Sequence, residues 1–218
     1  MNILDVWLEV IGRDGWSEAR LGTVAGLAGT TSVAVAEAVP DRWAALRGYG
    51  GRLDLAALAE AATDPASSVR ERLFAMFMER FDAAQDQRAA AQALSSAARR
   101  DPGLAAFMLM TLGLSVARIA DAAGVQTTGW FGAARVQALT MLYLQVSRTW
   151  LDDESADLAA TMKALDSQLA RAEGFANYFA RRRDQTSTDN ARVAEGHPDA
   201  PSVTAAEAPR SAVDPALG

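Results

Sequence analysis

A tight turn between two short helical segments is the feature that most restricts what this chain can fold into. In residues 21–28, apolar side chains recur at the i, i+3 and i+4 spacing of a helix with one buried face. Gly29 follows where that helix must stop and reverse, because glycine accepts the left-handed backbone that ends many helices. A second helix is predicted over residues 32–39, with three hydroxyl side chains placed to cap it: Thr30, Thr31 and Ser32.

A third helix is predicted directly after the second. Pro40 ends the preceding helix, and Asp41 is placed to cap the helix that begins at Arg42. Two short helices joined by a glycine turn and followed by an anchoring helix form the helix-turn-helix pattern. The sequence therefore predicts an N-terminal helix-turn-helix domain over residues 1–50.

The chain beyond this domain is also predicted to be helical, which gives an all-α fold. Helical spacing of apolar residues recurs in the ranges 42–62, 69–85, 86–100, 104–123, 130–151 and 155–183. Gly48, Gly50 and Gly51 interrupt the first of these ranges, and we expect a hinge or kink there. The larger domain is predicted to span residues 51–183 as a helical bundle.

Three helix starts in the predicted bundle carry capping signals. Ser68 with Glu71 three residues later forms a capping box, and Asp101 before Pro102 suits the first turn of a helix. The acidic run over residues 152–157 has the carboxylates of a hard-metal site. A solvated helix start is the favoured interpretation of this run, because the helix dipole attracts acidic side chains there.

Composition limits the chemistry that this chain can perform. Half of its 218 residues are hydrophobic, and its net charge of −6 argues against non-specific binding of nucleic acid or membrane surfaces by the whole protein. The absence of cysteine excludes disulfides, thiolate catalysis and cysteine metal sites. The only histidine, His197, lies in a proline-rich segment over residues 184–218 that we expect to be disordered. We expect a cytoplasmic protein that has no enzymatic activity, cofactor, metal or membrane span.

The order of residues in the helix-turn-helix segment resembles the N-terminal domain of TetR-type transcriptional regulators. The matching features are Gly-Trp at 15–16, Val-Ala at 24–25, Ala-Gly-Thr-Thr-Ser at 28–32 and Val-Pro-Asp-Arg-Trp-Ala-Ala-Leu at 39–46. From residue 15 to about residue 183 the chain also has the length and helical character of that family. The resemblance implies that the second short helix enters the major groove of DNA. It also implies that the last two long helices join two subunits into a dimer.

By this resemblance, DNA contacts are expected from the turn and from nearby arginines. These residues are Arg20, Thr30, Thr31, Ser32, Arg42 and Arg47. The reading helix departs from the family pattern, which usually has Lys or Thr near its start and Tyr and His near its end. Here the helix contains Ser32, Val33 and Ala34, then Ala36, Glu37 and Ala38. Residues 1–50 carry four basic and six acidic side chains, so an acidic head would bind DNA with hydroxyl groups taking over part of the usual basic role.

Aromatic and methionine side chains in the bundle predict a site for a small hydrophobic ligand or lipid. The expected ligand-binding residues are Phe74, Phe77, Phe81, Phe107, Met108, Trp130 and Tyr143, with Met110, Phe131 and Met141 converging on them. Core packing is the alternative interpretation of each. Subunit contacts in the homodimer are expected from Ala133, Leu139, Leu142, Leu165 and Leu169.

Two functions remain open from the sequence. The first is a TetR-type one-component regulator, a DNA-binding dimer whose two reading heads change their spacing when a hydrophobic ligand binds. The second is a lipid-binding accessory protein that has the same fold and does not bind DNA. Residues 150–158, with Thr161, Met162, Leu165 and Asp166, are similar to the C-terminal part of a TetR-fold ubiquinone-biosynthesis accessory family, which presents isoprenoid lipids to partner enzymes. We favour the first because such regulators are far more numerous and the head keeps its full length.

Overall fold

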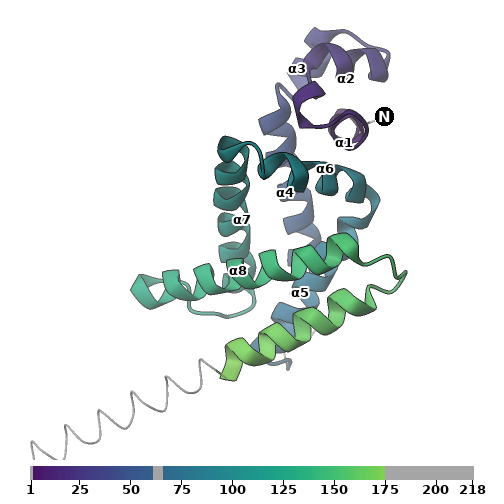
Figure 1. Cartoon of the computed structure of the whole chain (residues 1–218). Helices are drawn as coiled ribbons and strands as arrows, with labels where there is room; N and C mark the ends of the chain where they lie inside the picture. The colour runs from purple at the N-terminus through teal and green to yellow at the C-terminus, as the bar shows by residue number, and fades with distance from the viewer. Residues whose placement is uncertain (1, 61–65, 175–218) are drawn as a thin grey trace, which may run out of the picture. The chain divides into compact units, whose positions relative to one another are not determined.

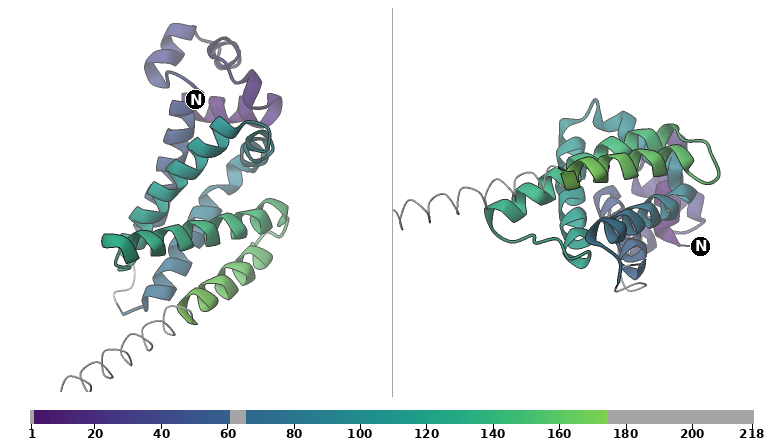
Figure 2. Two further views of the ribbon diagram at one scale, coloured as in Figure 1. Left: turned by 60° about the vertical axis from the view of Figure 1, so that its left-hand side comes forward. Right: turned by 90° about the horizontal axis from the view of Figure 1, so that it is seen from below.

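All regular structure in the described part of the chain, residues 2–60 and 66–174 of the computed structural model, is helical (Figure 1). The main helices are α1 (Ile3–Asp14), α2 (Leu21–Ala28), α3 (Ser32–Ala38), α4 (Arg42–Glu60), α5 (Val69–Ala83), α6 (Arg88–Ala98), α7 (Pro102–Ala122) and α8 (Gly129–Asp152). Two 3-10 segments, η1 (Trp16–Glu18) and η2 (Gln85–Gln87), stand between them. Residues 159–174 form one further helix, which runs back alongside α8 (Figure 2). The predicted all-α class is confirmed.

The turn between α2 and α3 has the geometry that its residues predict. Gly29 adopts the left-handed conformation with φ 65°, and its amide donates to backbone oxygens of α2. The Thr31 hydroxyl accepts a hydrogen bond from the Ala34 amide at 3.2 Å, which caps α3. The chain direction turns by 102° between the two helices, within the range of a helix-turn-helix unit. The helix-turn-helix pattern in residues 2–50, called the head below, is therefore present.

Helix α4 is continuous from Arg42 to Glu60, so the predicted interruption at its three glycines is wrong. The Asp41 carboxylate accepts from the Ala44 amide at 2.7 Å at the start of this helix. Buried side chains recur along one face at Ala45, Tyr49 and Leu53. This face packs against α5 and α7, and that packing outweighs the low helix propensity of glycines on the other faces.

A buried carboxylate joins α4 to two neighbouring helices. The Asp54 side chain is 2% exposed and accepts hydrogen bonds from Arg80 of α5 at 2.7 Å and Ser115 of α7 at 2.8 Å. Arg118 of α7 makes a second ion pair with it at 3.1 Å. The Arg80 guanidinium lies 5.4 Å from the ring centre of Tyr143 in α8. This polar network therefore links all four helices within an apolar core.

The predicted helix caps are present. Ser68 and Glu71 form both hydrogen bonds of the capping box, and Asp101 accepts from the Leu104 amide at 3.0 Å. In the acidic run, Asp153 is buried rather than solvated, which corrects that part of the prediction. Hydrogen bonds from Ser155 and Thr161 hold the pKa of the Asp153 carboxyl well below its usual range.

Helix α7 is the one described helix that is long and apolar enough to cross a membrane by length and composition. It begins at Pro102, two residues before the predicted range, and ends at Ala122, one residue before the end of that range. Within the fold it packs against α4, α6 and α8 and buries Leu104, Val116 and Ile119. The segment predicted to be disordered, the helix end over residues 175–183 and His197 lie outside the described residues.

A pair of glycine substitutions tests the packing of α8. A Cβ atom added at Gly132 would lie 2.2 Å from the backbone carbon of Thr127, whereas one at Gly50 would meet nothing within 4 Å. We expect Gly132→Ala to lower the free energy of unfolding by roughly 1–3 kcal/mol through this clash. Gly50→Ala should raise it by about 0.5–1 kcal/mol through helix propensity. Urea unfolding followed by circular dichroism measures both, and equal effects would contradict this packing.

Removal of the Asp54 carboxylate should leave a buried arginine without its counter-ion. Asp54→Ala is expected to lower the free energy of unfolding by roughly 3–5 kcal/mol. The matched control is Asp5→Ala. It removes a half-exposed ion pair to Arg52, which lies on α4 like Asp54, and should lower the free energy of unfolding by about 0–1 kcal/mol. The double variant Asp54→Leu/Arg80→Met should recover much of the loss, because no buried charge then remains. A double variant as unstable as Asp54→Ala would refute this explanation.

The low pKa of Asp153 predicts a pH-dependent contribution to stability. Asp153→Asn should lower the free energy of unfolding by roughly 1–2 kcal/mol near neutral pH. One carboxylate oxygen accepts from Ser155 and the other from Thr161, and an amide nitrogen cannot replace the second acceptor. A carboxyl with a lowered folded-state pKa stabilises the fold above its unfolded pKa of about 3.9, and that contribution is lost as the pH falls. The difference between the two proteins should therefore shrink below about pH 4. Asp152→Asn, at an exposed neighbouring position, serves as the control.

Candidate functional site

The outward face of α3 determines what the head could read on DNA. Val35 is fully buried against the head, while Ser32, Val33 and Glu37 are exposed. Direct recognition of bases in the major groove uses donors and acceptors together with apolar contacts to thymine methyl groups. This face offers one hydroxyl, one branched apolar side chain and one carboxylate. It can therefore support hydroxyl and methyl contacts, without the paired donors of Arg, Asn or Gln.

The turn and the nearby arginines do not form one continuous cluster. Arg20 precedes α2 and Thr30 follows its end, so these residues lie at opposite ends of that helix. Thr30, Thr31 and Ser32 are all exposed around the start of α3. Arg47 is exposed on α4, where its guanidinium lies 6.0 Å from the ring centre of Phe107 in α7.

Arg42 is held by the aromatic side chains of the head. Its guanidinium lies 4.5 Å from the ring centre of Trp16 and 5.8 Å from that of Trp43. It also donates a hydrogen bond to the Trp16 carbonyl at 3.1 Å. Arg20, in contrast, is largely exposed, and its Nε donates to the Ser17 carbonyl at 3.3 Å. The structure therefore leaves Arg20 freer than Arg42 to contact a phosphate.

Three of the predicted ligand-binding residues form a packed aromatic cluster in the bundle. Phe81 stacks on Tyr143 with a centroid distance of 4.6 Å, and Phe77 lies 5.2 Å from the same ring. Burial raises the pKa of Tyr143. Phe74 and Met108 are half-buried and pack against the core. These contacts are those of a core, which is the alternative that the sequence left open.

The other predicted ligand-binding residues lie elsewhere. Phe107 contacts Trp43 across α7 and α4, with a centroid distance of 4.8 Å. Trp130 is 83% exposed at the start of α8, so the structure does not bring it to the aromatic cluster. Phe131, Met110 and Met141 are also exposed. Their expected convergence is therefore wrong, because helical spacing alone did not reveal which face of α7 and α8 points to solvent.

The predicted subunit contacts need a similar correction. Leu139, Leu142, Leu165 and Leu169 are buried within the single chain, where α8 and the helix over residues 159–174 pack on the core. Ala133 is exposed. The large apolar side chains that these two helices expose are Trp130, Phe131, Met141 and Met162.

Sequence reasoning missed the polar centre of the bundle. The Tyr49 hydroxyl and Arg80 Nε are buried and have no hydrogen-bond partner within the described residues. Burial raises the pKa of Tyr49 to about 12. The signal in the sequence is Asp54, a carboxylate on the apolar face that contains Tyr49 and Leu53. Within residues 2–60 and 66–174, no three His, Cys, Asp or Glu side chains gather as a metal ion would require.

Comparison with solved structures identifies the architecture. A TetR transcriptional regulator from Nitrosomonas europaea is similar over 79% of this chain and 96% of its own, with a TM-score of 0.65 and 21% identity. A protein from a Rhodococcus species that is assigned to the TetR family covers 77% of this chain and 97% of its own, with a TM-score of 0.54 and 20% identity. No protein-family model matches this sequence, and no curated protein matches it significantly. The order, length and packing of its helices therefore give this chain the fold of TetR-type transcriptional regulators.

Proposed function

We propose that this protein is a DNA-binding transcriptional regulator that acts as a homodimer and responds to a small hydrophobic ligand. The observation that carries the proposal is the α2–α3 unit. Its glycine turn is capped, and α3 exposes Ser32 and Val33 on a fold shared with known regulators. In this proposal α3 enters the major groove, and the exposed hydroxyls around the turn position the head on phosphates.

The electrostatic part of DNA binding is proposed to be small. Phosphate contacts come mainly from Lys and Arg, and each contact contributes about 0.9 to the slope of log affinity against log salt. Among the predicted DNA-contact arginines of the head, Arg20 is the most available to contact a phosphate, because Arg42 stacks on Trp16 and Arg47 lies beside Phe107. Glu37 on the exposed face of α3 repels phosphate. We therefore expect a shallow salt dependence and a modest affinity.

The proposed dimer uses the outward face of the last two helices. Met141 is 54% exposed on α8, and Met162 is 41% exposed on the helix over residues 159–174. A two-fold contact through these helices would bury both side chains and set two heads at a fixed spacing. The ligand is proposed to enter the bundle near Tyr49 and Arg80, whose unpaired polar atoms would orient it.

A lipid-binding accessory protein is the second candidate. The observation that favours it is the apolar surface of α7 and α8, where Leu114, Trp130 and Phe131 are each more than half exposed. Such a surface suits an apolar partner, and the donor-poor face of α3 would then have no nucleic acid to read.

The deciding experiment measures binding of the purified protein to its own upstream DNA across about 50–200 mM salt. The regulator predicts saturable, sequence-selective binding. Arg20→Ala should weaken this binding almost equally for all DNA sequences and flatten the salt slope by about 0.9 for each lost contact. Arg20 is preferred to Arg42 for this test, because Arg42→Ala would also remove the contacts to Trp16.

The matched control for this measurement is Arg135→Ala, which removes an exposed arginine of α8 outside the head. It should leave both the affinity and the salt slope unchanged. No binding at the lowest salt would reject the regulator. Identification by mass spectrometry of a lipid that purifies with the protein would then support the accessory function.

A further inference from the structure

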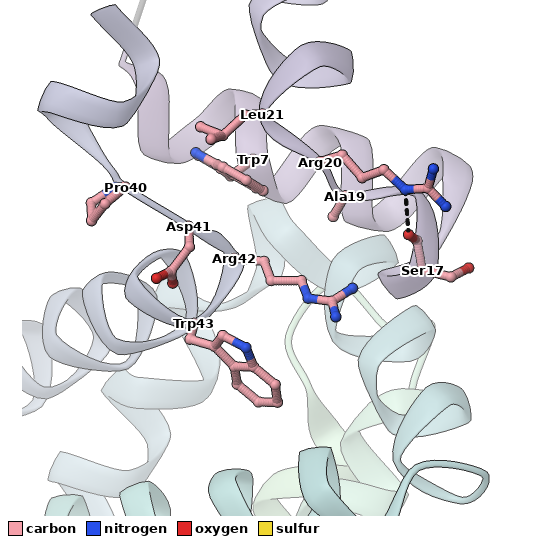
Figure 3. A pocket seen from close by; sticks show the side chains of 9 residues that line it. All are labelled: Trp7, Ser17, Ala19, Arg20, Leu21, Pro40, Asp41, Arg42 and Trp43. Carbon is pink, nitrogen blue, oxygen red and sulfur yellow. Dashed lines mark hydrogen bonds between the residues drawn. The ribbon is translucent and has the colours of Figure 1, made fainter. Parts of the chain in front are cut away.

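A hollow of about 530 Å³ lies in the head, separate from the bundle in which a ligand was expected (Figure 3). It opens between η1, the start of α2 and the junction of α3 and α4. Its volume falls in the range of small-molecule sites, roughly 300–1,000 Å³. We call it the head hollow. The residues that define its chemistry are Trp7, Arg20, Leu21, Asp41, Arg42 and Trp43.

Two arginines give one side of the head hollow a positive charge. Figure 3 shows the side chains of Arg20 and Arg42 extending in the same direction, toward Ser17. Arg42 is half-buried and makes no ion pair within the described residues. One of its N–H groups donates to the Trp16 carbonyl, and a guanidinium has five such groups, so further donors remain for a ligand.

The acidic side chains nearby do not neutralise this pair. Asp41 lines the head hollow and caps α4 through the Ala44 amide, and it forms no ion pair with Arg20 or Arg42 within the described residues. Glu18 lies 3.6 Å from Arg20, and both of these side chains are more than half exposed, so this ion pair is weak. Arg42 is half-buried without a carboxylate partner, and Arg20 lines the same hollow. An anion that binds here would therefore be stabilised by charge-assisted hydrogen bonds.

The remaining wall is apolar and partly aromatic. Leu21, Pro40 and the rings of Trp7 and Trp43 line it. Trp43 is fixed by edge contacts with Trp16 at 4.9 Å and Phe107 at 4.8 Å. A rigid apolar wall next to two guanidinium groups favours a flat apolar body that ends in a charged acceptor over a fully hydrated ion.

We propose that the head hollow binds a small aromatic carboxylate. The carboxylate accepts hydrogen bonds from Arg20 and Arg42, and the ring lies against Trp43 and Leu21. This site is distinct from the bundle, and its occupation does not require DNA binding. If the head also binds DNA through Arg20, the carboxylate and the DNA backbone compete for the same charge.

The test uses 2-naphthoate as the probe and the full chain as the receptor. Titration is followed through the five tryptophan indole N–H signals in a ¹H–¹⁵N spectrum, assigned by single Trp→Phe variants. We expect saturable shifts of the Trp7 and Trp43 signals, while those of Trp130 and Trp150 stay unchanged. The neutral amide, 2-naphthamide, should bind roughly 10- to 100-fold more weakly, because it lacks the charge that strengthens bonds to arginine.

Single substitutions locate the site. Arg20→Ala should weaken 2-naphthoate binding roughly 10-fold or more without affecting the fold, because its side chain is largely exposed. Arg135→Ala, an exposed arginine on α8, is the matched control and should leave the affinity unchanged. Circular dichroism of each variant confirms that the head remains folded.

Four outcomes would overturn the proposal. These are no saturation with 2-naphthoate, equal binding of the amide, an unchanged affinity in Arg20→Ala, or displacement by inorganic phosphate at equal concentration. The last result would assign the head hollow to simple oxyanions such as a DNA phosphate. None of these outcomes decides whether the protein is a regulator, because DNA binding is measured separately.

Discussion

The buried Asp54 carboxylate is the constraint on which the arrangement of the central helices depends. A charge in an apolar core must keep its partners, and those partners come from α5 and α7. Since α4 is one unbroken helix, the network in its second half also sets the position of its first turn. That turn carries Arg42 and Trp43, so the geometry of the head and that of the core are coupled through a single rigid element.

The head has an aliphatic core, and aromatic rings with one stacked arginine join that core to α4 and α7. Trp16, Trp43 and Phe107 form a chain of edge contacts from η1 to α7. Arg42 lies over the first two of these rings and donates to the Trp16 carbonyl. A guanidinium used in this way stabilises the fold of the head, and it is less available to DNA than its position after a recognition helix suggests.

The bundle packs aromatic side chains in its interior and also exposes large aromatic side chains on its surface. Phe77, Phe81 and Tyr143 pack as a closed cluster, whereas Trp130 and Phe131 stand in solvent. Burying large aromatic side chains is favourable, so their exposure marks a face that is suited to a partner or a second subunit. The two proposed functions differ in what covers this face and agree on the fold beneath it.

Much of the architecture followed from the sequence alone, because local signals specify helices. The Gly29 turn, the Thr31 cap, the capping box at Ser68 and the Asp101 cap are interactions between residues close in the chain, and the structure contains each one. Tertiary packing decided the rest. It kept α4 continuous through its glycines, buried Asp153, exposed Trp130 and brought Arg20 and Arg42 to one hollow. Helical spacing shows that a helix has an apolar face, but contacts between distant segments determine which side chains that face meets.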